Sequence, residues 1–177
     1  MFSIVQAQKI RQQVERILKI SGNYSGGILE MAIILDHNMD KEKVKNISAD
    51  LARTLKSHSE VFRNVRLNIV DWIADDNISE CVIPLPMIMM GSYFDGYKQE
   101  KQSKELKKLV EFIRLFQSRS KLIIMITDGE FVVSDVTEVK QLLYPFVIRK
   151  TFAMCFGDEE KTRKVFEAIQ LKNIYME

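Results

Sequence analysis

Short apolar runs alternate along this chain with stretches in which apolar residues recur at helical spacing. Residues 28–35 are apolar at every position except Glu30, and residues 121–130 contain a second such run that ends in a polar turn. Strands that are apolar on both faces are typical of the centre of a parallel sheet that helices cover on both sides. This alternation therefore predicts an α/β fold with a mostly parallel sheet.

The periodicity also places the remaining elements. Amphipathic helices are expected where apolar residues repeat every three or four positions, and strands where short runs are rich in β-branched and aromatic residues. Pro84 and Pro86 cannot donate ladder hydrogen bonds, so the run that contains them is predicted to be an edge strand. We expect helices within residues 1–20, 44–55, 106–116, 139–142 and 165–169, and strands at residues 65–73, 81–86 and 151–156.

Length and composition limit the class of protein. A chain of 177 residues that is 46% hydrophobic and 28% charged fits one globular domain, here residues 1–177. Within it, residues 1–22 add an amphipathic helix to a core at 28–177. The formal charge of +2 and the lack of an arginine-rich stretch argue against nucleic acid as a partner.

Location is constrained by what the sequence lacks. The amino terminus does not resemble a signal peptide, and no apolar run approaches the roughly 18 residues of a spanning helix, so we expect no membrane association. Cys81 and Cys155 both lie in apolar runs without metal-binding spacing. We interpret them as buried thiols in a reducing compartment, and the protein as cytoplasmic.

Oxygen-bearing side chains follow two of the predicted central strands. Asp36, Asn38 and Asp40 stand at alternate positions after the first strand, and Asp128 follows the strand near residue 126. Parallel strands bring their carboxyl ends to one edge of a sheet, where α/β proteins bind ligands. Carboxylate and amide oxygens are ligands of hard divalent cations such as Mg²⁺. The pattern therefore predicts a metal site at this edge.

At these residues the sequence resembles the von Willebrand factor A-like family, with "LDHNMD" at the family's Asp-x-Ser-x-Ser turn and "IMITDGE" at its later aspartate turn. The resemblance implies a Rossmann-like three-layer αβα sandwich with one antiparallel edge strand. It also implies a degenerate metal-ion-dependent adhesion site and a role in binding other proteins. The implied ligands are Asp36, Asn38, Asp40, Asp128 and, from "MMGSYFDG", Ser92. The implied partner contacts are His37, Tyr93 and Glu130.

The departures from the family pattern affect the expected chemistry. Asp40 replaces a neutral serine, so three carboxylates would give −3 against the +2 of a metal ion. A net negative site repels an acidic residue offered by a partner. We therefore expect either a structurally held cation or an empty site. An EF-hand loop is excluded, because Lys41 stands where glycine is required and Ile47 where glutamate is required.

Other interpretations remain open. Asp36, Asn38 and Asp40 could form a turn and helix cap, with Asp40 as the capping residue. The chain could also be a structural subunit with an inactive site. We expect a binding protein and not an enzyme. The enzyme alternative is a magnesium-dependent phosphohydrolase resembling the haloacid dehalogenase group. It would use Asp36 as nucleophile, Thr127 as the hydroxyl, a lysine such as Lys150, and "GDEEK" from Gly157 as the magnesium turn.

Residues 98–121 carry eight basic and three acidic side chains. Lys101, Lys104 and Lys108 are spaced to lie opposite the apolar stripe of the following helix. We interpret them as a solvated helix face, with docking of an acidic protein as the alternative.

Overall fold

The computed structural model describes residues 2–18, 28–57, 64–148, 152–157, 159–171 and 173–175. Within these ranges the chain forms a six-stranded sheet in the order β3-β2-β1-β4-β5-β6. Neighbouring strands are parallel, except that β3 runs antiparallel to β2 at one edge. The predicted α/β fold with a mostly parallel sheet and one antiparallel edge strand is confirmed. The strands are β1 (Leu29–Asp36), β2 (Val65–Ala74), β3 (Asn77–Ile83), β4 (Leu122–Ile126), β5 (Phe152–Gly157) and β6 (Asn173–Tyr175).

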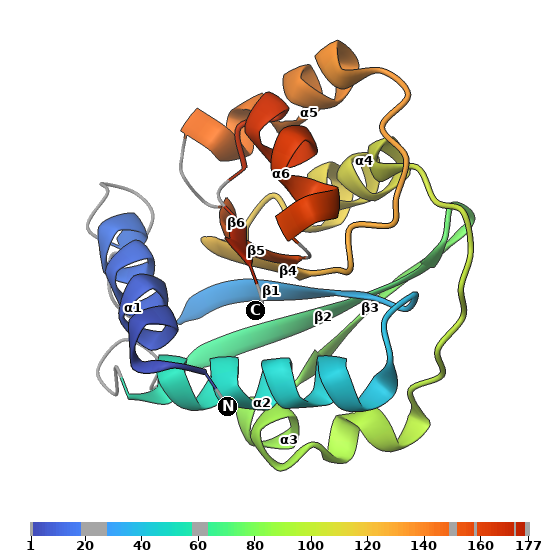
Figure 1. Ribbon diagram of the computed structural model, residues 1–177. Helices are drawn as coiled ribbons and strands as arrows, with labels where there is room; N and C mark the ends of the chain where they lie inside the picture. The colour runs from blue at the N-terminus through green and yellow to red at the C-terminus, as the bar shows by residue number, and fades with distance from the viewer. Residues whose placement is uncertain are drawn as a thin grey trace.

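Helices cover both faces of the sheet, which gives the three layers seen in Figure 1. Below the sheet in that view lie α2 (Lys41–Lys56) and α3 (Leu85–Met90), and the 3₁₀ helix η1 (Ser92–Gly96) follows α3. Helix α1 (Ile4–Leu18) stands at the left of the view and packs into the same core as α2. The upper layer contains α4 (Leu106–Phe116), α5 (Val136–Ile148) and α6 (Glu159–Ala168). The arrangement is Rossmann-like.

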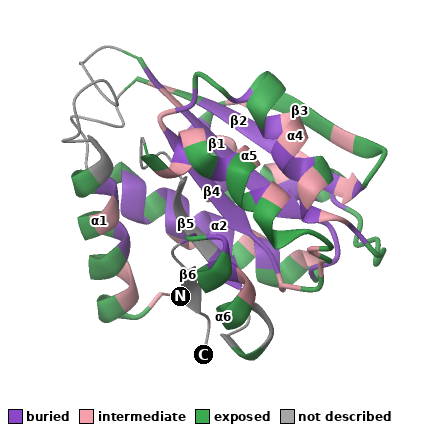
Figure 2. Ribbon diagram, turned by 90° about the horizontal axis from the view of Figure 1, so that it is seen from above, coloured by how far each residue is buried: buried purple, intermediate pink, exposed green. Residues whose placement is uncertain are grey.

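Strand β1 is the centre of the molecule, because it pairs with β2 on one side and β4 on the other. Its alternate side chains enter different cores: Met31 and Ile33 pack toward α1 and α2, whereas Ile34 packs toward α4 and α5. All residues of β1 except Glu30 are buried, as the purple strands of Figure 2 show. The double-sided apolar pattern of the sequence thus corresponds to a strand buried on both faces.

Helix α4 buries most of the apolar stripe that its sequence predicts, although Phe116 at its end is exposed. In α4 the buried residues are Leu106, Leu109, Val110 and Ile113. Burial of one such side chain contributes about 1.5–3 kcal/mol relative to exposure. The additional helix α1 inserts Ile10 and Val14 into the same core as α2. Figure 2 shows α1 with its exposed side turned outward.

Several elements differ from the sequence prediction, among them the edge strand and the tail. The edge strand ends at Ile83 and not at residue 86, because Pro84 caps a short helix, α3, in which Pro86 occupies the first turn. Proline suits that position, where no intrahelical partner is available for a backbone N–H group. Gly91 then ends α3 with a φ of 77°, a left-handed conformation that favours glycine. The tail at 173–175 is a parallel strand that the sequence analysis did not predict.

The prediction that Cys81 is buried is wrong. Cys81 lies on β3, the edge strand, where it is exposed; its Sγ donates to the hydroxyl of Tyr93 at 3.9 Å, and it forms no disulfide within the described part of the chain. The side chain of Cys155 is outside the described part of the chain. Among the described residues, no helix has both the length and the apolar character needed to cross a membrane.

Candidate functional site

Asp36 is the last residue of β1, and its side chain is fully buried at the carboxyl edge of the sheet. Leu35 pairs with Ile126, so Thr127 and Asp128 leave β4 at the same edge. The chain places β2 and β3 on one side of β1, and β4, β5 and β6 on the other. Asp36 and Thr127 therefore flank the point at which strand order reverses, where open α/β sheets bind their ligands.

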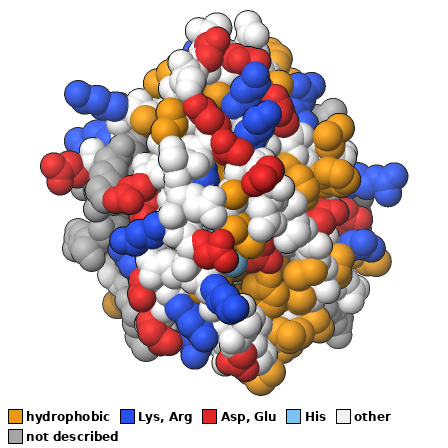
Figure 3. Space-filling model, turned by 90° about the vertical axis from the view of Figure 1, so that its right-hand side faces the viewer, with side chains coloured by type: hydrophobic (Ala, Val, Ile, Leu, Met, Phe, Trp, Pro, Cys, Tyr) orange, Lys and Arg blue, Asp and Glu red, His pale blue; other side chains and the backbone are white. Residues whose placement is uncertain are grey.

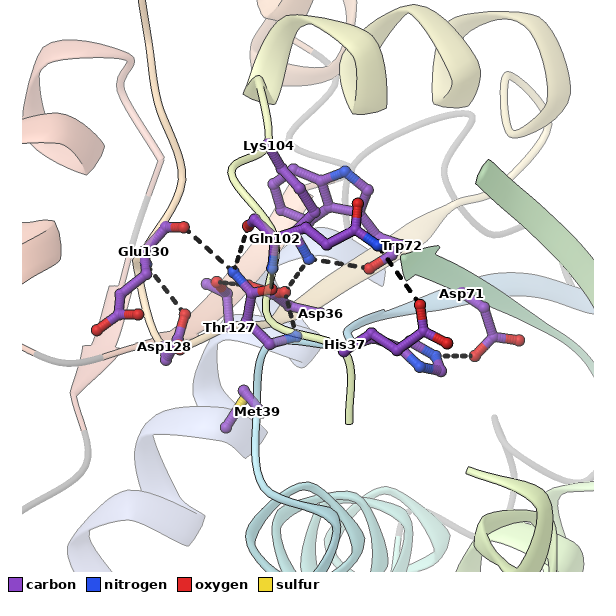
Figure 4. A network of polar contacts seen from close by, with 12 residues as sticks. Asp36, His37, Met39, Asp71, Trp72, Gln102, Lys104, Thr127, Asp128 and Glu130 are labelled. Atoms are coloured by element: carbon purple, nitrogen blue, oxygen red, sulfur yellow. Dashed lines mark hydrogen bonds and ion pairs between the residues drawn. The ribbon is translucent and has the colours of Figure 1, made fainter. Parts of the chain in front are cut away.

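Lys104 projects into this edge and forms an ion pair with Asp36 (Figure 4). Neither side chain is exposed to solvent. The Nζ group of Lys104 donates to Oδ1 of Asp36 and, at 3.0 Å, to the backbone oxygen of Trp72. It also lies 4.4 Å from the centre of the Trp72 ring, within the range of a cation–π contact. The prediction that Lys104 lies on a solvated helix face is wrong.

The position of Lys104 follows from backbone pairing that its local sequence does not reveal. Helix α4 begins only at Leu106, so Lys104 precedes it. The backbone N–H of Val132 donates to the oxygen of Lys104 at 2.7 Å, and that of Leu106 donates to the oxygen of Val132 at 3.0 Å. These bonds tie the entry of α4 to the loop that follows β4. Lys101 and Lys108, in contrast, are exposed.

Both carboxylate oxygens of Asp36 have further donors. Thr127 Oγ1 donates to Oδ2 at 2.6 Å, and the backbone N–H of Asn38 donates to Oδ1 at 3.0 Å. Thr127 Oγ1 in turn accepts from the N–H of Gly129 at 3.1 Å. A buried carboxylate with three donors, one of them a cation, is satisfied within the protein.

Asn38 connects the turn after β1 to two other loops. Its Oδ1 accepts from the N–H of Gln102 at 2.9 Å, and its Nδ2 donates to the backbone oxygens of Gln102 at 3.1 Å and Glu130 at 3.3 Å. Gln99 adds a bond from Nε2 to the backbone oxygen of Asn38 at 2.9 Å. The Asn38 side chain, only 4% exposed, thus joins the 97–104 segment to the loop after β4.

A second polar group surrounds His37, which is also buried. Its Nε2 lies 2.7 Å from Oδ1 of Asp71, and its Nδ1 lies 3.0 Å from the backbone oxygen of Lys98. Tyr93 donates to the other oxygen of Asp71 at 2.5 Å. The His37 ring stacks on Tyr97 at 4.3 Å between centroids. The predicted partner contacts His37 and Tyr93 are therefore engaged inside the protein, whereas Glu130 is exposed.

Two tyrosines reflect this buried environment. Burial raises the pKa of Tyr97, and the negative charge of Asp36 raises it further. Burial likewise raises the pKa of Tyr93, as does its hydrogen bond to Asp71. Tyr97 donates to the backbone oxygens of Asp36 at 3.2 Å and Met39 at 2.9 Å. Both phenols thus remain protonated donors: Tyr97 holds the turn after β1, and Tyr93 holds the Asp71 carboxylate on β2.

The other predicted metal ligands do not converge on Asp36. Asp40 is exposed and caps α2, accepting from the N–H of Lys43 at 3.1 Å, which is the capping role that we considered as an alternative. Ser92 is exposed on η1, and its hydroxyl donates to the backbone oxygen of Met87 at 3.4 Å. Oδ1 of Asp128 accepts from the N–H of Glu130 at 3.0 Å.

The charges of Asp36 and Lys104 act on Asp128, although Asp128 forms no hydrogen bond with either of them. Burial raises the pKa of Asp128, and the negative charge of Asp36 also raises it, while the Glu130 hydrogen bond and the positive charge of Lys104 lower it. Figure 4 shows its carboxylate directed toward the Glu130 backbone and away from Lys104.

The residues at this edge do not fit a divalent cation. The one fully buried carboxylate already holds an ammonium group, and the side chains of Asp40 and Ser92 are bonded elsewhere. In the described residues, no group of three His, Cys, Asp or Glu side chains is placed to hold a metal. A hard cation with 6–8 oxygen ligands, or Mg²⁺ with its octahedral shell, would have to displace Lys104.

The outer surface of this edge is charged and mixed in sign. Residues 98–103 form an exposed loop that passes over the buried Asp36–Lys104 pair. Figure 3 faces this edge and shows Lys, Arg, Asp and Glu side chains together on it, with hydrophobic side chains gathered at the lower right. The site therefore has a closed interior and a polar outer surface.

The sequence analysis missed Lys104, Trp72 and Asp71 as parts of this site, and it named Thr127 only for the phosphohydrolase. Lys104 is 68 positions from Asp36 in the chain. The available signal was that the helical stripe begins at Leu106, which leaves Lys104 outside the helix. Lys150 and Asp158 of "GDEEK", which the phosphohydrolase alternative concerned, are outside the described part of the chain.

No protein-family model matches the sequence, and no curated protein matches it either.

Proposed function

We propose that this chain is a protein-interaction module of the von Willebrand factor A type. Its recognition surface would be the loops at the carboxyl ends of β1 and β4 together with residues 97–104. The observation that carries the proposal is the edge itself: Asp36, Asn38 and Thr127 meet there from separate elements and are satisfied internally. Such an edge offers a fixed polar platform to a partner.

The closed interior supports binding over catalysis. A nucleophile must reach a substrate, but Asp36 has no exposed surface and both of its oxygens accept hydrogen bonds. The groups that a partner can reach are on the outer loops, where Lys98 and Lys101 are exposed and Asp128 is partly exposed. Charged loops on a rigid scaffold are common recognition elements.

Co-purification with a tagged full-length chain tests the proposal. Lys98→Glu/Lys101→Glu reverses two charges on the recognition surface, and Arg119→Glu is the matched control, because Arg119 is exposed near the start of β4 at the opposite edge. We expect a protein that the wild type and the control capture, that the double variant loses, and whose binding weakens with salt. A partner that survives the double variant but is lost with Arg119→Glu would place the interface elsewhere and refute the proposal.

We also propose a cytoplasmic location. The exposed Cys81, which forms no disulfide among the described residues, supports it, because exposed thiols persist in reducing compartments and are oxidised outside them. Mass spectrometry of the protein from its own cells, after alkylation under non-reducing conditions, tests this point. A Cys81 found in a disulfide would contradict it.

A second candidate is the phosphohydrolase, because one observation favours it. The hydroxyl of Thr127 and the ammonium group of a lysine both donate to the carboxylate of Asp36, and these are the residue types that such an enzyme uses. The lysine is Lys104 and not the Lys150 considered from the sequence. Hydrolysis of p-nitrophenyl phosphate with Mg²⁺, abolished by Asp36→Asn and retained in Lys101→Ala, would rank this function above the interaction module.

A further inference from the structure

We infer that the ammonium group of Lys104 takes the place of a divalent cation at the carboxyl end of β1. The site therefore binds no metal while Lys104 is present. The inference goes beyond the proposed function, because it concerns how the edge is held together and does not depend on which partner binds there.

The contacts of Lys104 are those of a bound cation. Its Nζ meets a carboxylate oxygen of Asp36 and the backbone oxygen of Trp72, and the Trp72 ring lies beneath it. The side chain has no exposed surface. An ammonium group placed in this way has exchanged its water shell for protein oxygens and an aromatic face, as a coordinated ion does.

Charge balance explains why a metal ion would be excluded. One buried carboxylate and one buried ammonium neutralise each other. A dication added beside them would be repelled by Lys104 and would leave the interior with net positive charge. A dication that displaced Lys104 would instead leave a buried ammonium unpaired. Asp128 carries the second negative charge that could offset the added positive charge, but its Oδ1 accepts a hydrogen bond from the backbone N–H of Glu130.

Hydrogen bonds hold the backbone around Lys104 in a position from which its side chain reaches Asp36. Residues 104–106 pair with Val132 through two backbone hydrogen bonds, and Gln102 is clasped by Asn38. The side chain of Lys104 extends from this fixed point across Trp72 to Asp36 (Figure 4). A partner loop or a metal could replace it only by opening the pairing between this segment and the loop after β4.

Removal of the Lys104 ammonium group should convert the space beside Asp36 into a metal site. In Lys104→Ala, the carboxylate of Asp36, the hydroxyl of Thr127 and the oxygen of Trp72 would surround a vacant, polar space. Oxygen ligands of these kinds suit Mg²⁺ and Mn²⁺. Because a ligand stabilises the folded state that binds it, the variant should gain stability when metal is added.

The test compares the full-length wild type, Asp36→Asn, Lys104→Ala, Asp36→Asn/Lys104→Ala and the exposed control Lys101→Ala. Melting temperatures are measured with chelator and with millimolar Mg²⁺, Mn²⁺ or Ca²⁺, and titration calorimetry follows binding. We expect no metal-dependent shift in the wild type and in Lys101→Ala. Lys104→Ala should show a rise in melting temperature with metal that the double variant lacks. Metal binding to the wild type that Asp36→Asn abolishes overturns the inference, and so does a folded Lys104→Ala that ignores all three ions.

A measurement on the wild type keeps the inference testable if Lys104→Ala fails to fold. Native protein is acylated at its lysines and the modified positions are mapped by mass spectrometry. We expect Lys104 to react many-fold more slowly than Lys101, with no change when Mg²⁺ is added. Equal labelling of the two lysines, or labelling of Lys104 that Mg²⁺ accelerates, would show that the ammonium does not hold the site.

Discussion

Replacing Lys104 by methionine should destabilise the protein more than any other single change at a lysine that we consider. Methionine keeps an apolar stem over Trp72 but removes the charge, so Asp36 remains as a buried carboxylate without its cation. Loss of one partner of a buried ion pair costs about 3–5 kcal/mol. Asp36 retains its bonds from Thr127 and Asn38, which places the expected loss near the lower end, about 3 kcal/mol.

Urea denaturation followed by circular dichroism measures this loss. With a slope of about 1–3 kcal/mol per molar urea, the midpoint should fall by roughly 1–3 M while the slope stays constant. The exposed control Lys101→Met should change stability by no more than about 0.5 kcal/mol. A double variant, Asp36→Asn/Lys104→Met, should lose less than the sum of the two single losses, by roughly 0.5–3 kcal/mol.

The reasoning would be refuted by a small effect. If Lys104→Met costs less than about 1 kcal/mol and equals the Lys101→Met control, the ammonium does not compensate a buried charge. Strict additivity of the Asp36 and Lys104 losses would lead to the same conclusion, because it would show that the two side chains do not interact in solution.

Three further changes test the remaining contacts. Thr127→Val removes the donor to Oδ2 of Asp36 and should cost about 1.5–3 kcal/mol by chemical denaturation, whereas Thr127→Ser should cost much less. Asp128→Asn should stabilise the protein at pH 7, because burial raises the pKa of Asp128 and its ionised form is therefore penalised in the folded state. That gain should diminish as the pH falls through the raised pKa and vanish below the ordinary value of 3.8, and melting curves across this range would contradict the argument if the gain grew in acid. Asp40→Ala should cost about 0.5–2 kcal/mol through loss of the α2 cap, Asp40→Asn should cost little, and neither should alter any response to Mg²⁺.

The sheet could be predicted because its signal is local. Residues 29–36 and 122–126 are apolar on both faces, and each position in such a run reports burial by itself. The cap at Asp40 is also a local feature, since it depends only on a side chain and a backbone N–H three residues later. Alternation of these elements was sufficient to give the fold class and the edge at which Asp36 and Asp128 leave the sheet.

The content of the site was not predictable in the same way. Asp36, Asn38 and Asp40 share a spacing that suits a metal, yet each has a different role: ion pair, loop clasp and helix cap. Their roles differ because residues from distant segments bind their side-chain oxygens. Gln102 donates to Oδ1 of Asn38, and Thr127 donates to Oδ2 of Asp36. The exposure of Cys81 has the same origin, because only the order of strands decides that β3 stands at an edge.

The sequence by itself thus determined the central strands with their polar ends and the amphipathic helices, because hydrophobic periodicity acts over a few residues. Only the tertiary structure decided that Lys104 enters the interior to meet Asp36, because its location depends on backbone pairing between residues 104–106 and Val132 and on a carboxylate that lies 68 positions away. A lysine that precedes an amphipathic helix has the same local sequence pattern whether it is exposed or buried. Lys104 is buried because the fold places the buried carboxylate of Asp36 beside it.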